Sequence, residues 1–154
     1  MSGPEERLAE LGLSVPEVAK PVAVYVPAVR TGNYVFTSGQ LPMRSGELML
    51  TGKVGGEVSP EEAVECAEQC ALNAIAAVKA QIGDLAKVRR VVKVVAFVAS
   101  TPDFTGQPQV ANGASELFGK VFGDAGVHAR SAVGVPVLPL DAPVEVEIMV
   151  EVGD

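Results

Sequence analysis

The chain has 154 residues, of which 48% are hydrophobic and 20% charged, a composition typical of one globular domain and unlike that of disordered or low-complexity sequences. No apolar run approaches the ~18 residues of a membrane span, and the acidic start at residues 1–7 lacks the basic and apolar regions of an export signal, so we expect a cytoplasmic protein. The net charge of −7 opposes a general attraction to nucleic acid, because binding to phosphates depends on clustered Lys and Arg.

Two small groups of residues have simple interpretations. Cys66 and Cys70 are the only cysteines, and their four-residue spacing on a predicted helix indicates reduced packing thiols rather than a disulfide framework or a zinc site. The one basic cluster has no aromatic residues between its members for base stacking, so we interpret it as a solvated strand edge and expect no nucleic-acid partner. It consists of Lys87, Arg89, Arg90 and Lys93.

The N-terminal part of the chain divides into an extension and the start of a domain. Leucines among charged residues predict a short helix over residues 5–13, within an extension that we place at residues 1–21. A single domain over residues 22–154 then begins with two β-rich runs, 22–29 and 33–37, which predict a hairpin that turns at Arg30, Thr31 and Gly32. A third short strand is predicted over residues 48–50.

The remaining elements are two helices and three strands. Ser59, Pro60 and Glu62 form the pattern of a capping box with proline at the first helical position, and the helix they start is predicted to stop at Gly83. Apolar spacing predicts a second helix over 110–122, with residues 105–109 as an insertion before it. Three β-rich runs predict strands; they cover residues 88–99, 130–137 and 144–152.

This order of elements, β-β-β-α-β-α-β-β, has too few helices to cover both faces of a sheet. It predicts an α+β fold with one mixed sheet and both helices on one face. The last strand alternates apolar and mostly acidic residues between Val144 and Val152, so its apolar side should lie under the helices. The other face would meet solvent or further subunits, and it is a natural surface for symmetric assembly.

Arg130 is the first candidate for a binding residue. On its predicted strand it shares a face with Ala132 and Gly134, and small neighbours leave room for a guanidinium to clasp a carboxylate or phosphate through two hydrogen bonds. A salt bridge to one of the many acidic residues is the alternative. We expect no metal at His128, the only histidine, because no second ligand accompanies it, and a nucleophilic pair with Ser131 is disfavoured because the two would face opposite ways.

Three separated segments resemble the signature of the reactive-intermediate deaminase family (RidA, also called YjgF). The similarity runs from about residue 22 to residue 152. The segments are Tyr25 through Arg30-Thr31-Gly32-Asn33 to Thr37-Ser38-Gly39-Gln40-Leu41-Pro42, then Phe104 with Asn112 and Phe118, and then Ala129-Arg130-Ser131 through Leu138-Pro139 to Val144-Glu145-Val146-Glu147.

The resemblance implies a chorismate-mutase-like fold of the bacillus type, a homotrimer with sites at the clefts between subunits, and hydrolysis of reactive enamines and 2-imino acids to 2-oxo acids and ammonium. It implies no cofactor and no metal, since an imine carbon is already electrophilic and needs only a docking cation, an aligned water and a modest general base. The family is also named after an endoribonuclease activity, which the acidic composition disfavours here. A trimeric protein that binds small carboxylates, or has a regulatory or chaperone-like role without turnover, is the alternative.

The resemblance also assigns roles to residues. Arg130 would bind the substrate carboxylate and Glu145 would activate or position water. The substrate-binding positions implied are Tyr25 lining the site, Ser38 and Gly39 at its floor, Asn112 supporting it, and Ala132, where the family commonly has a cysteine.

Departures from the family pattern indicate a divergent subgroup. The usual Gly-Pro-Tyr is here Ala23-Val24-Tyr25, and the usual Pro-Ala-Arg is His128-Ala129-Arg130. If the last two strands form a hairpin around Asp141, Glu145 lies roughly 23 Å along the strand from Arg130. The two residues then cannot share a small substrate within one chain, so either the strands are not neighbours or the site is assembled between subunits.

Overall fold

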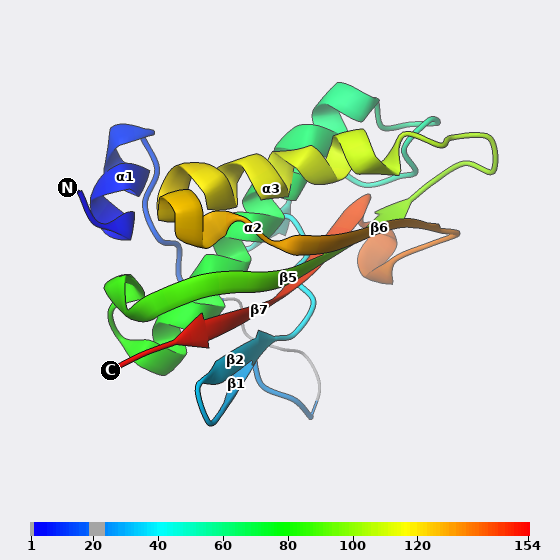
Figure 1. Ribbon diagram of the computed structural model, residues 1–154. Helices are drawn as coiled ribbons and strands as arrows, with labels where there is room; N and C mark the ends of the chain where they lie inside the picture. Colours follow the sequence, from blue (N-terminus) through cyan, green and yellow to red (C-terminus); the bar gives the residue numbers. More distant parts are fainter. Residues whose placement is uncertain (1, 19–23) are drawn as a thin grey trace.

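A computed structural model describes residues 2–18 and 24–154 and contains a five-stranded mixed sheet in the order β1-β2-β7-β5-β6 (Figure 1). Strands β5 and β6 pair in parallel, and the other neighbouring pairs are antiparallel. The strands are β1 (Ala28–Thr31), β2 (Tyr34–Thr37), β5 (Val88–Ala99), β6 (Ala129–Val135) and β7 (Val144–Val152). The helices are α1 (Pro4–Glu10), α2 (Pro60–Ile82) and α3 (Gln107–Phe122).

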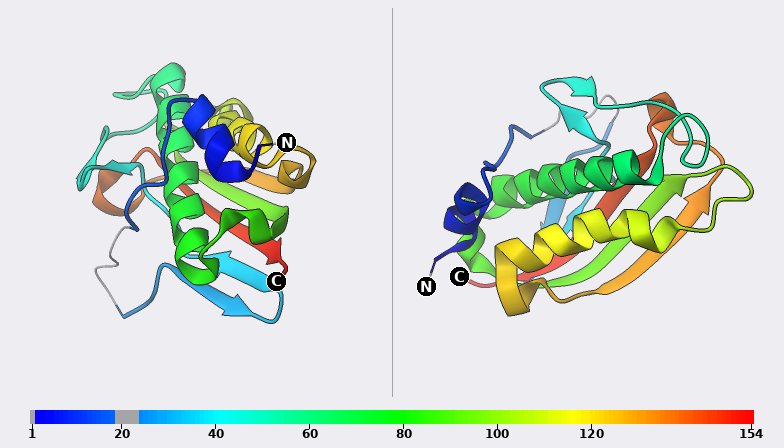
Figure 2. Two further views of the ribbon diagram at one scale, coloured as in Figure 1. Left: turned by 90° about the vertical axis from the view of Figure 1, so that its left-hand side faces the viewer. Right: turned by 90° about the horizontal axis from the view of Figure 1, so that it is seen from above.

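The helices and the sheet form two layers. Figure 2 shows α2 and α3 side by side on one face of the sheet, with α1 beside the end of α3. This confirms the predicted α+β class and the placement of both long helices on one face. Leu8 of α1 is only 1% exposed and belongs to the main core, whereas the predicted boundary between residues 21 and 22 lies outside the described residues. Within the described ranges, no helix combines the length and the apolar character needed to cross a membrane.

Helix α2 begins and ends where its sequence predicts. The Ser59 hydroxyl accepts a hydrogen bond from the Glu62 backbone N–H at 3.1 Å, and the Glu62 carboxylate accepts one from the Ser59 N–H at 3.0 Å. These two bonds form the capping box, which satisfies N–H groups that a helix start leaves without partners. Gly83 ends the helix with φ +81°, a conformation that costs glycine little.

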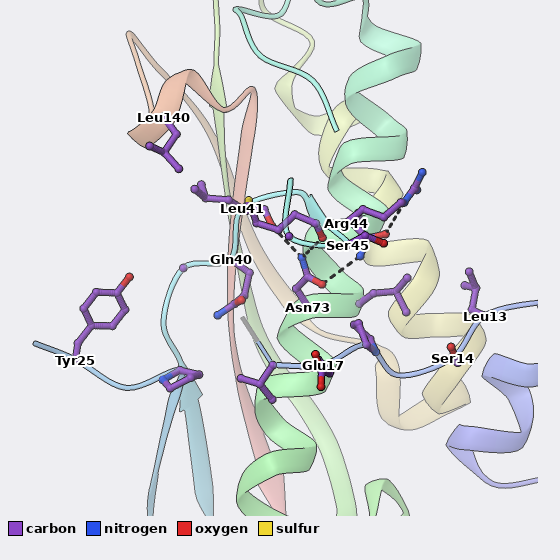
Figure 3. Close-up of a pocket in the computed structure, with 18 of the residues that line it drawn as sticks. Leu13, Ser14, Glu17, Tyr25, Gln40, Leu41, Arg44, Ser45, Asn73 and Leu140 are labelled. Atoms are coloured by element: carbon purple, nitrogen blue, oxygen red, sulfur yellow. Dashed lines mark hydrogen bonds between the residues drawn. The ribbon is translucent and has the colours of Figure 1, made fainter. Parts of the chain in front are cut away.

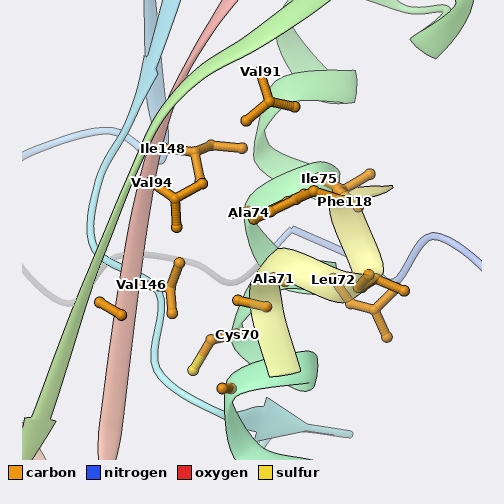
Figure 4. Close-up of a cluster of buried hydrophobic side chains, with 14 of the residues drawn as sticks. Cys70, Ala71, Leu72, Ala74, Ile75, Val91, Val94, Phe118, Val146 and Ile148 are labelled. Atoms are coloured by element: carbon orange, nitrogen blue, oxygen red, sulfur yellow. The ribbon is translucent and has the colours of Figure 1, made fainter. Parts of the chain in front are cut away.

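The core lies between the two layers (Figure 4). One face of β7 is apolar and buried under the helices, as the alternation predicts; it consists of Val144, Val146, Ile148, Val150 and Val152. Small residues of α2, among them Cys70 and Ala71, allow that helix to approach the sheet closely. The two helices also meet closely, because a Cβ on Gly113 of α3 would lie 2.2 Å from the Val64 carbonyl oxygen of α2.

The structure corrects several element boundaries. The hairpin of β1 and β2 turns at Gly32 and Asn33, not at residues 30–32, because Thr31 already pairs with Tyr34. Of the predicted first strand, residues 22–23 lie outside the described residues, and the observed strand starts at Ala28. The N-terminal helix ends at Glu10 rather than at residue 13.

Two further segments differ from the prediction. The third strand does not join the main sheet: β4 (Glu47–Leu48) pairs only with β3 (Met43–Arg44) in a separate two-stranded ribbon. Residues 107–109, predicted to belong to an insertion, form the first turn of α3, where Pro108 is tolerated because the first helical N–H groups have no partner.

The last two strands are not hairpin neighbours, so that arrangement is wrong. Strand β5 lies between them and pairs in parallel with β6 on one side and antiparallel with β7 on the other. The parallel pairing uses α3 as its crossover, and β6 ends at Val135 rather than at residue 137. The chain then passes through a short 3₁₀ turn, Pro139–Asp141, before it enters β7.

Candidate functional site

Arg130 and Glu145 point to opposite faces of the sheet. Arg130 is in register with Val94 of β5, which is in register with Ile148 of β7, and these two partners are buried under the helices. Glu145 is in register with Phe97 and stands between the buried Val144 and Val146. Because successive side chains of a strand point to opposite faces, Glu145 faces the side without helices. We call this second side the open face.

The Arg130 guanidinium is held by neutral groups. Its Nη1 donates to Asn112 Oδ1 at 2.7 Å and to Ser115 Oγ at 3.2 Å, both on α3. Among the described residues no carboxylate forms a salt bridge with Arg130, and no hydrogen bond engages its Nε or Nη2. The salt-bridge alternative therefore finds no partner in the described ranges. The edge of the guanidinium formed by Nε and Nη2 has the geometry that binds a carboxylate through two parallel bonds.

Glu145 is a half-buried carboxyl group packed against the loop that follows β2. A Cβ on Gly39 would lie 2.6 Å from Glu145 Oε1, so any larger residue there would force the Glu145 carboxylate to move. Gln40 fixes this loop to β7 through two backbone hydrogen bonds with Val146, at 2.8 and 3.0 Å. Burial, and to a smaller extent the negative charge of Glu147, raise the pKa of the Glu145 carboxyl above its ordinary value.

Tyr25 and Ser38 adjoin the same loop. The Ser38 hydroxyl donates to the Val26 carbonyl at 2.6 Å, which holds the residue after Tyr25 against the loop. Tyr25 is 51% exposed. Four of the predicted site residues, Tyr25, Ser38, Gly39 and Glu145, are thus grouped around the end of β2.

A cavity of about 960 Å³ lies beside this group, between residues 12–18, the β3–β4 ribbon and α2 (Figure 3). It touches Tyr25 and Gly39 but not Arg130, Asn112 or Glu145. Its amides bond to one another: Gln69 Nε2 donates to Asn73 Oδ1 at 3.1 Å, and Asn73 Nδ2 donates to the carbonyls of Leu41 and Met43. These bonds secure the loop before the ribbon to α2, so we assign the cavity a structural role.

Within one chain the predicted residues therefore form two separate groups. Arg130 and Asn112 lie together on the helix side, and Ala132 shares that side of β6 and packs against the core. Arg130 is three residues along the strand from the register position of Glu145 and two strands away, which is about 10 Å in each direction. A small substrate cannot contact both residues of the same chain.

Sequence reasoning missed the roles of Ser115 and His128, which lie beside the predicted Asn112 around Arg130. His128 does not pair with Ser131, which is in register with Val95 on the open face. Its Nε2 instead lies 2.8 Å from Ser115 Oγ and its Nδ1 lies 2.6 Å from the Gly126 carbonyl oxygen. The available signal was the spacing of Asn112 and Ser115, because residues three apart on a helix share a side. In the described part of the chain, no three His, Cys, Asp or Glu side chains gather to form a metal site.

Comparisons with known proteins agree with this architecture. Residues 5–152 match the family model described as "YjgF/chorismate_mutase-like, putative endoribonuclease". Protein TCP17 of Trypanosoma cruzi is 44% identical, with 96% of this chain and 92% of the relative covered. A 2-iminobutanoate/2-iminopropanoate deaminase of Dermatophagoides farinae is 36% identical, with 90% and 93% covered.

A solved structure extends the agreement to the fold. The crystal structure of the protein Atu1372 from Agrobacterium tumefaciens is 48% identical and superposes with a TM-score of 0.91, with 97% of this chain and 93% of that chain covered. The match of the family model over nearly the whole chain and the similarity of these relatives confirm the resemblance inferred from the sequence. The chain belongs to the YjgF/chorismate-mutase-like family.

Proposed function

We propose that this protein is a cofactor-free hydrolase that converts 2-imino acids, and the enamines in equilibrium with them, into 2-oxo acids and ammonium. The observation that carries the proposal is the Arg130 guanidinium, which is held by Asn112 and Ser115 without a carboxylate partner among the described residues. A partly buried guanidinium of this kind attracts a carboxylate ligand, because the charge otherwise lacks a counter-ion. The similarity to a relative named as an imine deaminase supports the same substrate class.

The reaction needs few protein groups. Arg130 docks the carboxylate, and Glu145 accepts a proton from water as the water oxygen bonds to the imine carbon. The electron pair of the C=N π bond moves to nitrogen, which takes up the proton held by Glu145. The amine of the resulting carbinolamine takes a second proton from solvent, the hydroxyl gives its proton to Glu145, and the C–N bond breaks as the C=O bond forms. The ammonia released takes up a proton to become ammonium and leaves the 2-oxo acid. A carboxyl group whose pKa is raised above its ordinary value suits both the acceptance and the return of the proton.

The two groups would meet between subunits of a homotrimer. Arg130 lies on β6, an edge strand of the sheet, while Glu145 lies on the open face. The open face carries exposed apolar side chains, including Val29, Phe36 and Val133. Burying such side chains against a second copy is favourable. Each cleft would then be lined by residues of two subunits. One subunit would contribute Arg130 and Asn112, and its neighbour would contribute Glu145, Gly39 and Tyr25.

The direct test measures the decay of freshly generated 2-iminopropionate and 2-iminobutyrate by trapping with semicarbazide. We expect the wild type to accelerate decay, Arg130→Ala to lose this effect and Arg130→Lys to recover little of it, because an ammonium cannot form the paired bonds of a guanidinium. Arg30→Ala is the matched control: Arg30 is exposed on β1, so its loss should leave the rate unchanged.

No acceleration by a folded wild-type protein, over several side-chain sizes, would overturn the hydrolase. A role in binding without turnover would then be indicated if 2-oxo acids still bind in an Arg130-dependent way. In a protein that only binds, Glu145→Gln should leave the binding of 2-oxo acids unchanged, because no catalytic step would depend on the carboxylate.

A further inference from the structure

A chain of hydrogen bonds runs from the backbone through His128 and Ser115 to Arg130. The Gly126 carbonyl oxygen lies 2.6 Å from His128 Nδ1, His128 Nε2 lies 2.8 Å from Ser115 Oγ, and Arg130 Nη1 lies 3.2 Å from the same oxygen. We propose that Ser115 and His128 are positioning residues that fix the orientation of the Arg130 guanidinium. This role rests on the proposed function, in which Arg130 docks the substrate carboxylate.

The His128 ring is held on three sides. Besides its two hydrogen-bonded nitrogens, it makes an edge-to-face contact with Phe118, with ring centroids 6.0 Å apart and an interplanar angle of 86°. The Gly126 carbonyl is itself fixed, since a Cβ on Gly126 would lie 2.2 Å from the Phe118 carbonyl oxygen. The glycine allows the chain to pass close to α3. The ring therefore serves as a rigid support rather than as a mobile side chain.

The chemistry of the partners sets the direction of every bond in the chain. A backbone carbonyl only accepts, so His128 Nδ1 carries the hydrogen, and in the neutral ring Nε2 is then an acceptor. The Ser115 hydroxyl donates to Nε2, which leaves its lone pairs to accept from Arg130. With Asn112 Oδ1 accepting a second bond, both hydrogens of Arg130 Nη1 are engaged. The plane of the guanidinium is thereby fixed.

This orientation has a functional consequence. With Nη1 turned toward α3, the edge of the guanidinium formed by Nε and Nη2 faces away from Asn112 and Ser115. That is the edge that forms two parallel bonds with a carboxylate. A guanidinium that is already oriented loses less conformational entropy when it binds, so the pair should act on substrate affinity.

A serine hydroxyl bonded to a histidine is also the arrangement that activates a serine nucleophile. The surroundings of Ser115 argue against a nucleophilic role for it. The Ser115 oxygen is already engaged by both His128 and Arg130. Ser115 lines neither the cavity of about 960 Å³ described above nor a smaller one of about 370 Å³ beside Arg44 and Glu62. A nucleophile needs an open approach to its oxygen, so positioning is the role that this environment supports.

The hydrogen-bond direction can be tested without any activity. His128 is the only histidine, so nitrogen–proton correlation spectra of ¹⁵N-histidine-labelled protein contain the ring signals of one residue. At about pH 8, where an ordinary histidine is neutral, we expect the tautomer with hydrogen on Nδ1. Ser115→Ala should shift the Nε2 resonance. Finding the hydrogen on Nε2 would overturn the proposal, because Ser115 then could not donate to that nitrogen.

The effect on Arg130 is tested with imine hydrolysis and with pyruvate as a carboxylate probe. We expect Ser115→Ala and His128→Ala to raise KM and the Kd of pyruvate about tenfold with little change in kcat, since the lost orientation weakens docking in ground and transition states alike. Ser115→Thr, which keeps the hydroxyl, should restore the wild-type values. Ser131→Ala, next to Arg130 but on the open face, should change neither.

The outcomes separate the two proposals. Wild-type turnover combined with unchanged KM and Kd in Ser115→Ala would overturn the positioning role and leave the hydrolase intact. Absence of both turnover and pyruvate binding in the wild type would overturn both. Labelling of Ser115 by a fluorophosphonate would also contradict the positioning role, because it would identify a freely reactive hydroxyl.

Discussion

Arg130 and Glu145 sit in environments that suit different tasks. Arg130 is surrounded by neutral acceptors from α3, which leave its positive charge available to a ligand. Glu145 is half-buried and has Glu147 nearby, and both features oppose its negative charge. A carboxyl group that is costly to ionise in the folded protein is a better proton acceptor than an exposed one.

Glu145→Gln should therefore abolish turnover and at the same time stabilise the protein at neutral pH. Because the folded pKa of Glu145 lies above its ordinary value of 4.5, the folded wild type binds the proton more tightly than the unfolded chain does. The wild type therefore loses folding stability as pH rises from 4.5 through the folded pKa, because the unfolded chain releases this proton more readily. The glutamine side chain of Glu145→Gln does not titrate, so the variant avoids this loss. Urea unfolding of both proteins across this range measures the difference. A variant less stable than wild type at neutral pH would contradict the account.

The sequence alone indicates part of this site. The strand pattern singled out Arg130 with its small neighbours, and the resemblance placed Asn112 in the same site without predicting that the two side chains bond to each other, as they do in the structure. The contact of His128 with Ser115 could not be predicted, because it joins the residue before β6 to the middle of α3 and depends on how the two pack. Neither residue has a local pattern that indicates the other.

At the scale of elements, the crossing of α2 and α3 determines where Asn112 and Ser115 lie above β6. The two helices approach so closely at Gly113 that a Cβ would lie 2.2 Å from the Val64 carbonyl oxygen. The backbone of α2 cannot yield as a flexible side chain would. Gly113 is the neighbour of Asn112, so the packing of the helices and the support of Arg130 are linked.

Gly113→Ala should lower the free energy of unfolding by about 1–3 kcal/mol through overpacking. Gly119→Ala is the matched control on the same helix: nothing lies within 4 Å of its added Cβ, and removing a helical glycine should raise stability by about 0.5–1 kcal/mol. Urea denaturation of the two variants beside wild type gives both values. Equal effects of the two substitutions would contradict the close crossing.

Helices and strands with strong local sequence patterns were predictable, whereas the order of the strands in the sheet was less predictable. The capping box at Ser59, the stop at Gly83 and the alternation in β7 give three boundaries that the structure confirms. The order of the strands was missed, because β5 separates β6 from β7 through pairings between distant segments. The predicted hairpin turn at residues 30–32 was one residue too early, because Thr31 already pairs with Tyr34 and the chain reverses at Gly32 and Asn33.

At the scale of the whole molecule, the sheet separates the two halves of the site. The helix side holds Arg130 and the open face holds Glu145, so the proposed reaction requires two copies of the chain. The exposed apolar side chains of the open face, including Tyr34 and Phe36, give such copies a surface on which to associate. The sequence left two alternatives open, namely that the last two strands are not hairpin neighbours or that the site is assembled between subunits. The strands are not neighbours, yet Arg130 and Glu145 still lie apart within one chain.

The most direct measurement co-expresses Arg130→Ala and Glu145→Gln subunits with different affinity tags and assays imine hydrolysis by purified mixed trimers. Each variant alone should be inactive. Every mixed trimer contains one cleft with both native residues, so we expect about one third of wild-type activity. No recovery of activity in mixed trimers that have assembled would contradict a site shared between subunits.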